Sequence, residues 1–273
     1  MTLSRGLNRT LIHGLLLVFA VLTFYPVLML VNLSFKDPNA FNSAPMSLSI
    51  PPHVENYALA WKFMQDPVWH NIVVGAVATL LSLGMASLTA FVFARFQFPG
   101  RDALFALMLV ILLVPGTILL VPMYQVIIQL KLQNTLWALI LSYAAHQSLM
   151  IFVLRTFFAE LPQEMFDAAR VDGASVLQLF WRIALPLSLP ALSAMAIFQV
   201  WWIWNDYAWP SLVANSNEAR TAVTGLIFFN DFSRPEPGAG MAAAVIAALP
   251  MVLLFLVSMR TFIAGLTSGA IKE

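Results

Sequence analysis

The sequence contains no cysteine and few charged side chains, and both scarcities limit what the protein can be. Without cysteine the chain has no disulfide scaffold, no thiolate metal site and no cysteine nucleophile. Charged residues make up 10% of the 273 residues, whereas a typical soluble domain has about 25%. Apolar residues make up 60%, which exceeds the ~45–50% of soluble domains and excludes intrinsic disorder. The composition therefore indicates a membrane protein.

Common catalytic motifs are missing as well. The sequence has no G-x-x-x-x-G-K-[ST] phosphate-binding loop and no H-E-x-x-H zinc motif. Its four histidines, at positions 13, 53, 70 and 146, form no metal-ligand spacing. We therefore expect that the chain performs no covalent chemistry, has no catalytic residue and binds neither a metal nor a cofactor.

Six long apolar runs account for most of the hydrophobic residues. They lie at about residues 11–33, 72–93, 103–128, 136–154, 187–209 and 241–259. Each is close to the ~20 residues that cross ~30 Å of hydrocarbon as a helix, and the alternating segments of a membrane barrel are absent from the sequence. The sequence therefore predicts an all-α integral membrane protein with six transmembrane helices in a domain at residues 11–262.

Prolines interrupt three of these runs, at Pro26, Pro115, Pro122 and Pro250. Each removes a backbone donor and bends its helix. The bends fit either tolerated kinks in a packed bundle or kinked helices that line a path and move.

The distribution of basic residues predicts the orientation. Nine of the 14 Lys and Arg residues fall on the side that holds both termini and the loop at residues 159–186, and five fall on the other side. Because cytoplasmic loops carry the excess of basic residues, we expect residues 1–10, this loop and the tail at 263–273 to be cytoplasmic. The segment at about 211–238 then lies outside.

The cytoplasmic loop is longer and more patterned than a connection between spans needs to be. Residues 163–171 are typical of a short helix, with Glu164 early and Arg170 late, as the helix dipole favours. Gly173 suits a left-handed stop, and Ser175 can cap a second short helix. Four acidic residues between positions 160 and 172 disfavour binding to anionic lipid. A docking surface for a cytoplasmic protein fits better than a helix lying on lipid.

The same run resembles the EAA loop of permease subunits of bacterial ATP-binding-cassette importers. The matching residues, which keep the spacing of that loop, are Asp167, Ala168, Ala169, Asp172, Gly173, Ala174, Phe180, Ile183 and the exit at 185–187. The resemblance implies the type I importer permease fold. It also implies that the loop from Glu164 to Phe180 forms coupling helices that seat in a separate ATPase subunit. Asp167 stands where the family has glutamate, which keeps the charge on a shorter side chain.

Further segments resemble carbohydrate importers of the maltose and glycerol-3-phosphate type. They lie at residues 25–26, 34–36, 56–57, 94–96, 98–100 and 204–206. The tail resembles that of the shorter second permease of the maltose-type system, which implies that this tail reaches the ATPases through Gly265, Leu266, Thr267, Gly269 and Lys272.

The resemblance also implies a location and a set of partners. The location is the bacterial inner membrane. The expected partners are a second permease, two ATPase subunits that bind ATP and magnesium, and an external substrate-binding protein that meets residues 211–238. No contact with nucleic acid is expected, because the net charge is only +1.

Polar and aromatic residues within the spans are candidates for contact with a substrate. His146 has Ser142 one turn before it, so both a structural hydrogen bond and a place in the path remain open. Tryptophans at 201, 202, 204 and 209 fit either an interfacial aromatic belt or stacking on sugar rings. The candidate path residues are Tyr124, His146, Gln199, Trp204, Asn205 and Asp206.

Two other function classes fit the sequence less well than an importer subunit. An ion-coupled secondary transporter of a small polar solute needs buried charges near the bilayer midplane, and the spans have almost none apart from His146 and Asp206. A membrane enzyme needs a cluster of acids, histidines or metal ligands on one face, and the sequence suggests none. The loop pattern favours the importer subunit.

Overall fold

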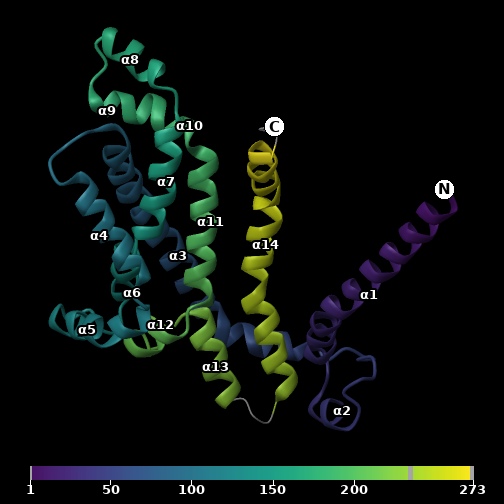
Figure 1. The fold of residues 1–273 in the computed structure, drawn as a ribbon. Helices are drawn as coiled ribbons and strands as arrows, with labels where there is room; N and C mark the ends of the chain where they lie inside the picture. The colour runs from purple at the N-terminus through teal and green to yellow at the C-terminus, as the bar shows by residue number, and fades with distance from the viewer. Residues whose placement is uncertain (1, 233–235, 271–273) are drawn as a thin grey trace. The chain divides into compact units, whose positions relative to one another are not determined.

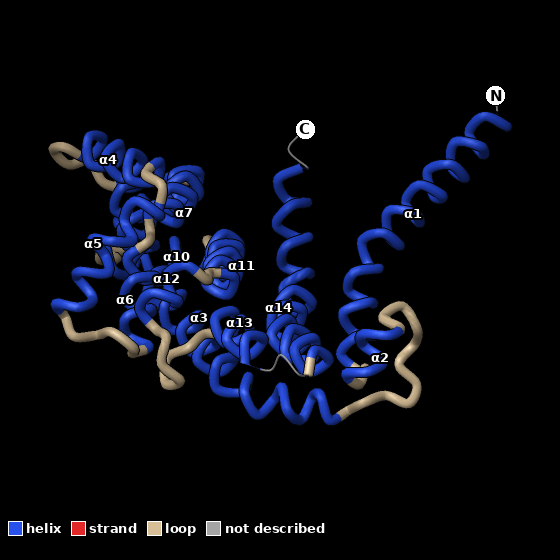
Figure 2. Tube along the Cα trace, turned by 90° about the horizontal axis from the view of Figure 1, so that it is seen from below, coloured by secondary structure: helices blue, strands red, loops and turns tan. Residues whose placement is uncertain are grey.

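The computed structural model describes residues 2–232 and 236–270, with side chains for 12–231 and 236–259 (Figure 1). All regular elements in this part of the chain are helical, and Figure 2 shows only helices and loops there. The all-α prediction is therefore confirmed. The chain divides into two compact units, one of Met1–Gln65 and Gly225–Leu249, the other of Asp66–Thr224 and Pro250–Glu273.

Three helices are long and apolar enough to cross a membrane. They are Ile12–Ser34 in α1 (Thr2–Ser34), all of α3 (Glu55–Arg95) and Pro237–Met259 in α14 (Pro237–Ala270). Helix α3 has 41 residues, which at 1.5 Å per residue makes it about 60 Å long, or twice the hydrocarbon thickness. It begins at Glu55, well before the apolar run at 72–93. The apolar run starts later than the helix because Glu55, Lys62 and Asp66 place charges in the first half of the helix.

Three further pairs of helices are long and apolar enough to cross a membrane only when each bent pair is taken together. The pairs are α4 (Arg101–Leu113) with α5 (Gly116–Gln129) at 99°, α6 (Leu136–Ala145) with α7 (Ser148–Glu160) at 43°, and the run Val176–Leu187 with α11 (Leu189–Asn205) at 73°. Among the described residues there are thus three candidate spans made of one helix each, and up to six if each bent pair counts as one.

The sharpest bend has a clear chemical cause. Residues 103–128 form a single long apolar run in the sequence that contains Pro115, and the structure breaks it at Val114 and Pro115. Proline lacks the backbone N–H that would continue the helix, and it forces the preceding residue into an extended conformation. Val114 has ψ 121°, as this steric effect requires. Proline in this run therefore divides the helix and does not merely kink it.

In the first unit, the motifs at 34–36 and 56–57 meet. The side-chain amide of Asn56 donates to the carbonyls of Ser34 and Lys36, both at 2.9 Å. The buried ammonium of Lys36 donates to the Ala44 carbonyl at 2.7 Å, just after α2 (Pro38–Ser43). Gly238 lies so close that a Cβ there would clash with the Lys36 carbonyl and with Asn56. These contacts join the end of α1 to the starts of α3 and α14.

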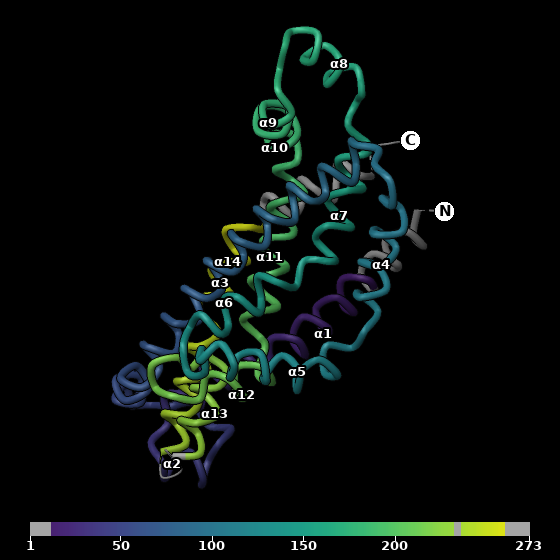
Figure 3. Tube along the Cα trace, turned by 90° about the vertical axis from the view of Figure 1, so that its left-hand side faces the viewer, coloured from purple at the N-terminus to yellow at the C-terminus, as the bar shows by residue number. Residues whose placement is uncertain are grey.

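The second unit has two apolar clusters. One gathers side chains of α3 and α7 with those of α8 (Gln163–Val171) and α9 (Val176–Leu179). The other gathers side chains of α3, α5, α6, α11 and α12 (Ala208–Val213). Figures 1 and 3 place α8 and α9 beyond one end of α7, and α5 and α12 towards its other end. The coupling-loop candidates and the path candidates therefore occupy opposite ends of this unit.

Candidate functional site

Helix α8 forms over the residues that the sequence predicts, Gln163–Val171. Pro162 precedes it, and a proline at that point loses nothing because the first backbone N–H groups of a helix have no internal acceptor. Glu164 lies in the first turn and Arg170 in the last, each where the helix dipole stabilises its charge. The local rules therefore suffice to form this helix.

The turn after α8 is also built as predicted. Gly173 has φ +80°, in the left-handed region that favours glycine. Its N–H donates to the Arg170 carbonyl at 3.0 Å, and the N–H of Ala174 donates to the Ala169 carbonyl at 2.9 Å, which is the Schellman pattern. Ser175 and Gln178 then form a capping box at the start of α9. The turn thus closes one helix and opens the next within three residues.

The loop at residues 159–186 contains α8 and α9, and we call it the α8–α9 loop. Its buried side is aromatic. Phe166 and Phe180, which are 1% and 2% exposed, pack in one cluster with Phe91 of α3 and Phe158 of α7. The ring centroid of Phe91 lies 6.3 Å from that of Phe166 and 5.4 Å from that of Phe180. Aromatic pairs at this range add to the hydrophobic gain of burial. The loop is therefore packed onto the ends of two long helices.

The outer side of the loop carries both charged and apolar side chains. Of the predicted coupling residues, Glu164, Asp167, Ala168, Asp172 and Gly173 are exposed, Ala169 and Ala174 are half-buried, and Phe180 is buried. Large apolar side chains are exposed beside them, at Met165, Val171, Val176, Leu177 and Trp181. Exposed apolar groups next to charges are typical of a surface that binds another protein.

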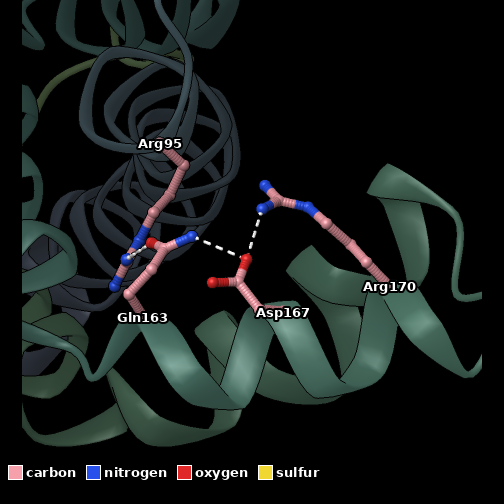
Figure 4. A network of polar contacts seen from close by, with 4 residues as sticks. All are labelled: Arg95, Gln163, Asp167 and Arg170. Carbon is pink, nitrogen blue, oxygen red and sulfur yellow. Dashed lines mark hydrogen bonds and ion pairs between the residues drawn. The ribbon is translucent and has the colours of Figure 1, made fainter.

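A polar network links α8 to the end of α3 (Figure 4). Arg95 donates to Oε1 of Gln163 at 2.9 Å and to the Leu161 carbonyl at 2.7 Å. The amide of Gln163 donates to Oδ1 of Asp167 at 2.9 Å, and Arg170 donates to the same oxygen at 2.9 Å. The carboxylate that replaces the family's glutamate is thus already engaged within its own chain.

At the other end of this unit, two adjoining cavities open beside α6 and α11. Their volumes are about 290 Å³ and about 270 Å³, and Gly116, His146 and Trp202 line both. Ligand pockets usually hold roughly 300–1,000 Å³, so the two cavities together reach that size. Apolar side chains dominate the walls, with a few polar groups among them.

The polar groups of the first cavity form a small constellation. The Tyr143 hydroxyl donates to Oδ2 of Asp206 at 2.9 Å. The Trp202 ring lies edge-on to Tyr143, with 5.6 Å between centroids, and its centroid is 5.8 Å from that of His146. Ser142 also lines this cavity. An aromatic face beside a carboxylate and hydroxyls has the chemistry to bind a polyhydroxylated ligand.

The structure brings only some of the candidate path residues to these cavities. Asp206 lines the first cavity, Gln199 lines the second, and His146 lines both. Tyr124 and Asn205 lie outside both linings, where Tyr124 accepts from Gln133 at 3.0 Å and Asn205 donates to the Trp201 carbonyl at 2.8 Å. Trp204 is buried in the protein, away from both linings.

Tyr143 and Arg95 are the functional candidates that sequence reasoning missed. Tyr143 lies one residue before the pair Ala144 and Ala145 in an apolar run, and a buried tyrosine hydroxyl needs a partner. That requirement was a signal for Tyr143 in the sequence. Arg95 belongs to the motif at 94–96, but the motif does not indicate which residues Arg95 contacts.

The structure describes the candidate residues of the C-terminal tail in less detail. Gly265, Leu266, Thr267 and Gly269 lie in the backbone of α14, and their side chains are not described. Lys272 lies outside the described residues. In the described parts of the chain, no three His, Asp or Glu side chains come together in a group that could hold a metal ion.

Comparison with known proteins identifies the family. The model of the binding-protein-dependent transport system inner membrane component family matches residues 82–267, which include the α8–α9 loop and both cavities. The chain belongs to this family. The resemblance that the loop motif suggests is therefore confirmed.

Curated relatives extend over nearly the whole chain. The arabinooligosaccharides transport system permease protein of Halalkalibacterium halodurans is 34% identical over 263 residues, 93% of this chain and 92% of the relative. The trehalose/maltose transport system permease protein of Thermococcus litoralis is 30% identical over 271 residues, 96% of each chain.

A solved structure shares the fold. It is a chain of a bacterial ABC transporter involved in the import of the acidic polysaccharide alginate, with a TM-score of 0.83 over 94% of this chain and 97% of that chain, at 18% identity. The importer permease fold that the loop motif implies is thus confirmed.

Proposed function

We propose that this chain is one of two permease subunits of an ATP-driven importer, and that the cargo is a carbohydrate. The relatives whose names specify a substrate, for arabinooligosaccharides and for trehalose and maltose, support the carbohydrate class. The chain would be a multi-pass protein of the bacterial inner membrane with both termini cytoplasmic. Separate ATPase subunits would bind ATP and magnesium and hydrolyse the ATP.

The α8–α9 loop is the observation that carries the proposal. Its buried face is fixed to α3 and α7, while its outer face exposes acidic and apolar side chains together. Such a surface suits a protein partner, and rigid packing behind it would pass the partner's movement to the helices. We therefore assign Glu164, Asp167, Ala168, Asp172 and Gly173 to contact with an ATPase. The tail at 263–273 would be a second contact.

The cavities beside α6 and α11 support a direct part in translocation. Trp202 could stack on the apolar face of a sugar ring, while Asp206, Tyr143 and Gln199 bind hydroxyls. The second permease would close the open side, and the segment at 211–238 would meet the external binding protein. Under this proposal His146 belongs to the path, although its contact with the Ser142 carbonyl at 3.3 Å also fits the structural role considered for it.

The proposal is tested by purifying the tagged chain with its co-expressed neighbours and reconstituting the complex in proteoliposomes. An ATPase and a second permease should co-purify. Carbohydrate uptake should require ATP and the binding protein, and it should persist when ionophores collapse all ion gradients. Uptake by this chain alone, driven by an ion gradient, would refute the proposal in favour of a secondary transporter.

A further inference from the structure

Arg95 is the last residue of α3, and its guanidinium contacts the chain that leads into α8 in three ways. It donates to the Leu161 carbonyl at 2.7 Å and to Oε1 of Gln163 at 2.9 Å. Its Cζ also lies 4.0 Å from the centre of the Phe166 ring, in a cation–π contact. One side chain of α3 therefore binds Leu161, two residues before α8, the first turn of α8 and the buried face of α8. Figure 4 shows the contact with Gln163.

Only a guanidinium can make all three contacts at once. Its planar fork carries several N–H donors in fixed directions and stacks flat on a ring, whereas the lysine ammonium is a point charge on a flexible stem. The Phe166 ring under it is 1% exposed and also packs on Phe91 of α3. The polar and apolar contacts thus hold α8 against the same helix.

Gln163 extends this contact to the exposed surface. Its Oε1 accepts from Arg95 and its Nε2 donates to Asp167, so both ends of the amide are committed. The Asp167 carboxylate, which also accepts from Arg170, is therefore two hydrogen bonds away from α3. A partner group that pulls on Asp167 would pull on the end of α3 through Gln163 and Arg95.

We propose that Arg95 is a positioning residue that fixes α8 to α3, so that movement of the α8–α9 loop becomes movement of the α3 helix. Without it, only the packing of Phe166 and Phe180 on Phe91 would hold this loop to α3, and the polar link from Asp167 to α3 would be lost. This inference rests on the proposed function for its coupling role, but the attachment of α8 to α3 is a property of this chain alone.

The decisive variant is Arg95→Lys, which keeps the positive charge at a half-buried site. A matched control is Arg155→Lys. Arg155 lies on α7 and stacks on Phe105 of α4 at 4.1 Å, so the same chemical change is made at a cation–π contact that does not involve α8. A second variant, Gln163→Met, removes the amide from an exposed position and keeps the side-chain length, so folding should not be at risk.

Because the chain has no cysteine, two spin labels can report the attachment directly. One is placed at Val171 of α8, which is 88% exposed, and the other at Val92 of α3, which is 42% exposed. The label distance is measured in the assembled transporter with and without ATP. Uptake per ATP hydrolysed is measured in matching unlabelled preparations, because Val171 lies on the surface assigned to the ATPase.

The reference chain should give a narrow distance distribution. Arg95→Lys and Gln163→Met should broaden it and lower uptake per ATP, by about tenfold for Arg95→Lys, because a hydrogen bond to a charged group shifts an equilibrium by at least that factor. Arg155→Lys should change neither quantity. An unbroadened distribution in both test variants overturns the attachment. A broadened distribution with normal uptake per ATP leaves the attachment standing but overturns the coupling role proposed for Arg95.

Discussion

The α8–α9 loop and the cavity beside α6 and α11 each present a carboxylate, but the two are held differently. Asp167 is exposed, and its partners Gln163 and Arg170 belong to the same short helix. Asp206 is half-buried, and its Oδ2 accepts from Tyr143, which lies 63 positions earlier in the chain, while its Oδ1 accepts a longer bond of 3.4 Å from the N–H of Trp209. A loop shaped by residues close in sequence should lose its function when one of those residues is replaced. In a site formed by a contact between distant residues, replacing either partner should cause about the same loss as replacing both.

The largest effect that follows from this contrast is expected at Gly173. Gly173→Val places a β-branched residue at φ +80°, although no atom lies within 4 Å of the added Cβ. Backbone strain of this kind costs about 2 kcal/mol, which corresponds to roughly a thirtyfold shift in the population of the native turn. Uptake per ATP should fall by a similar factor, measured in proteoliposomes, while membrane insertion stays normal.

Gly173→Asn is the matched control, because asparagine tolerates the left-handed region far better. It should keep most of the uptake. Equal loss in both variants would show that the glycine itself, and not its backbone angle, is what the loop requires.

The next prediction tests whether Tyr143 and Asp206 act as a pair in the cavity. Tyr143→Phe removes the donor and Asp206→Ala removes the acceptor of the 2.9 Å hydrogen bond, and a bond to a charged group contributes about 1.5–3 kcal/mol. Each variant should lower carbohydrate uptake at saturating binding protein by about tenfold. The double variant should be little worse than either single one, because both changes remove the same contact.

Additive losses would contradict this account, since they would mean that the two side chains act independently. Normal uptake in all three variants would show that the substrate does not depend on this cavity.

The smallest effect is expected at the cap of α9. Ser175→Ala removes the acceptor for the Gln178 N–H, a bond of 3.3 Å, and the loss of such a cap costs about 1 kcal/mol. Amide hydrogen exchange in α9 should become about fivefold faster, while uptake changes little. Ser175→Thr, which keeps the hydroxyl, should exchange at the original rate. Unchanged exchange in Ser175→Ala would show that burial of Leu179 and Phe180 alone holds α9 in place.

These two regions also differ in how far the sequence predicts them. The limits of α8, the left-handed Gly173 and the capping role of Ser175 were all predicted and are confirmed. Each depends on hydrogen bonds between residues no more than five positions apart. The predicted path residues fared differently, because residue type and location in a span do not fix which way a side chain points. Gln199, His146 and Asp206 line the cavities, whereas Tyr124, Trp204 and Asn205 do not.

The bends of the spans are also predicted only in part by the sequence. The sequence contains Pro115, but it does not show that the apolar run around this residue divides into two helices at 99°. That angle depends on what each half packs against. Likewise the contact between Arg95 and the start of α8 joins positions 66 to 68 apart.

The sequence by itself determined that this is a helical membrane protein of the importer permease family, and it determined the shape of the α8–α9 loop. The lengths of the apolar runs, the positions of the charges and the residues at the turns are local properties, so they can be read directly from the sequence. Only the tertiary structure decided that Tyr143 meets Asp206 and that Arg95 fixes α8 to α3, because those contacts form only after distant helices pack.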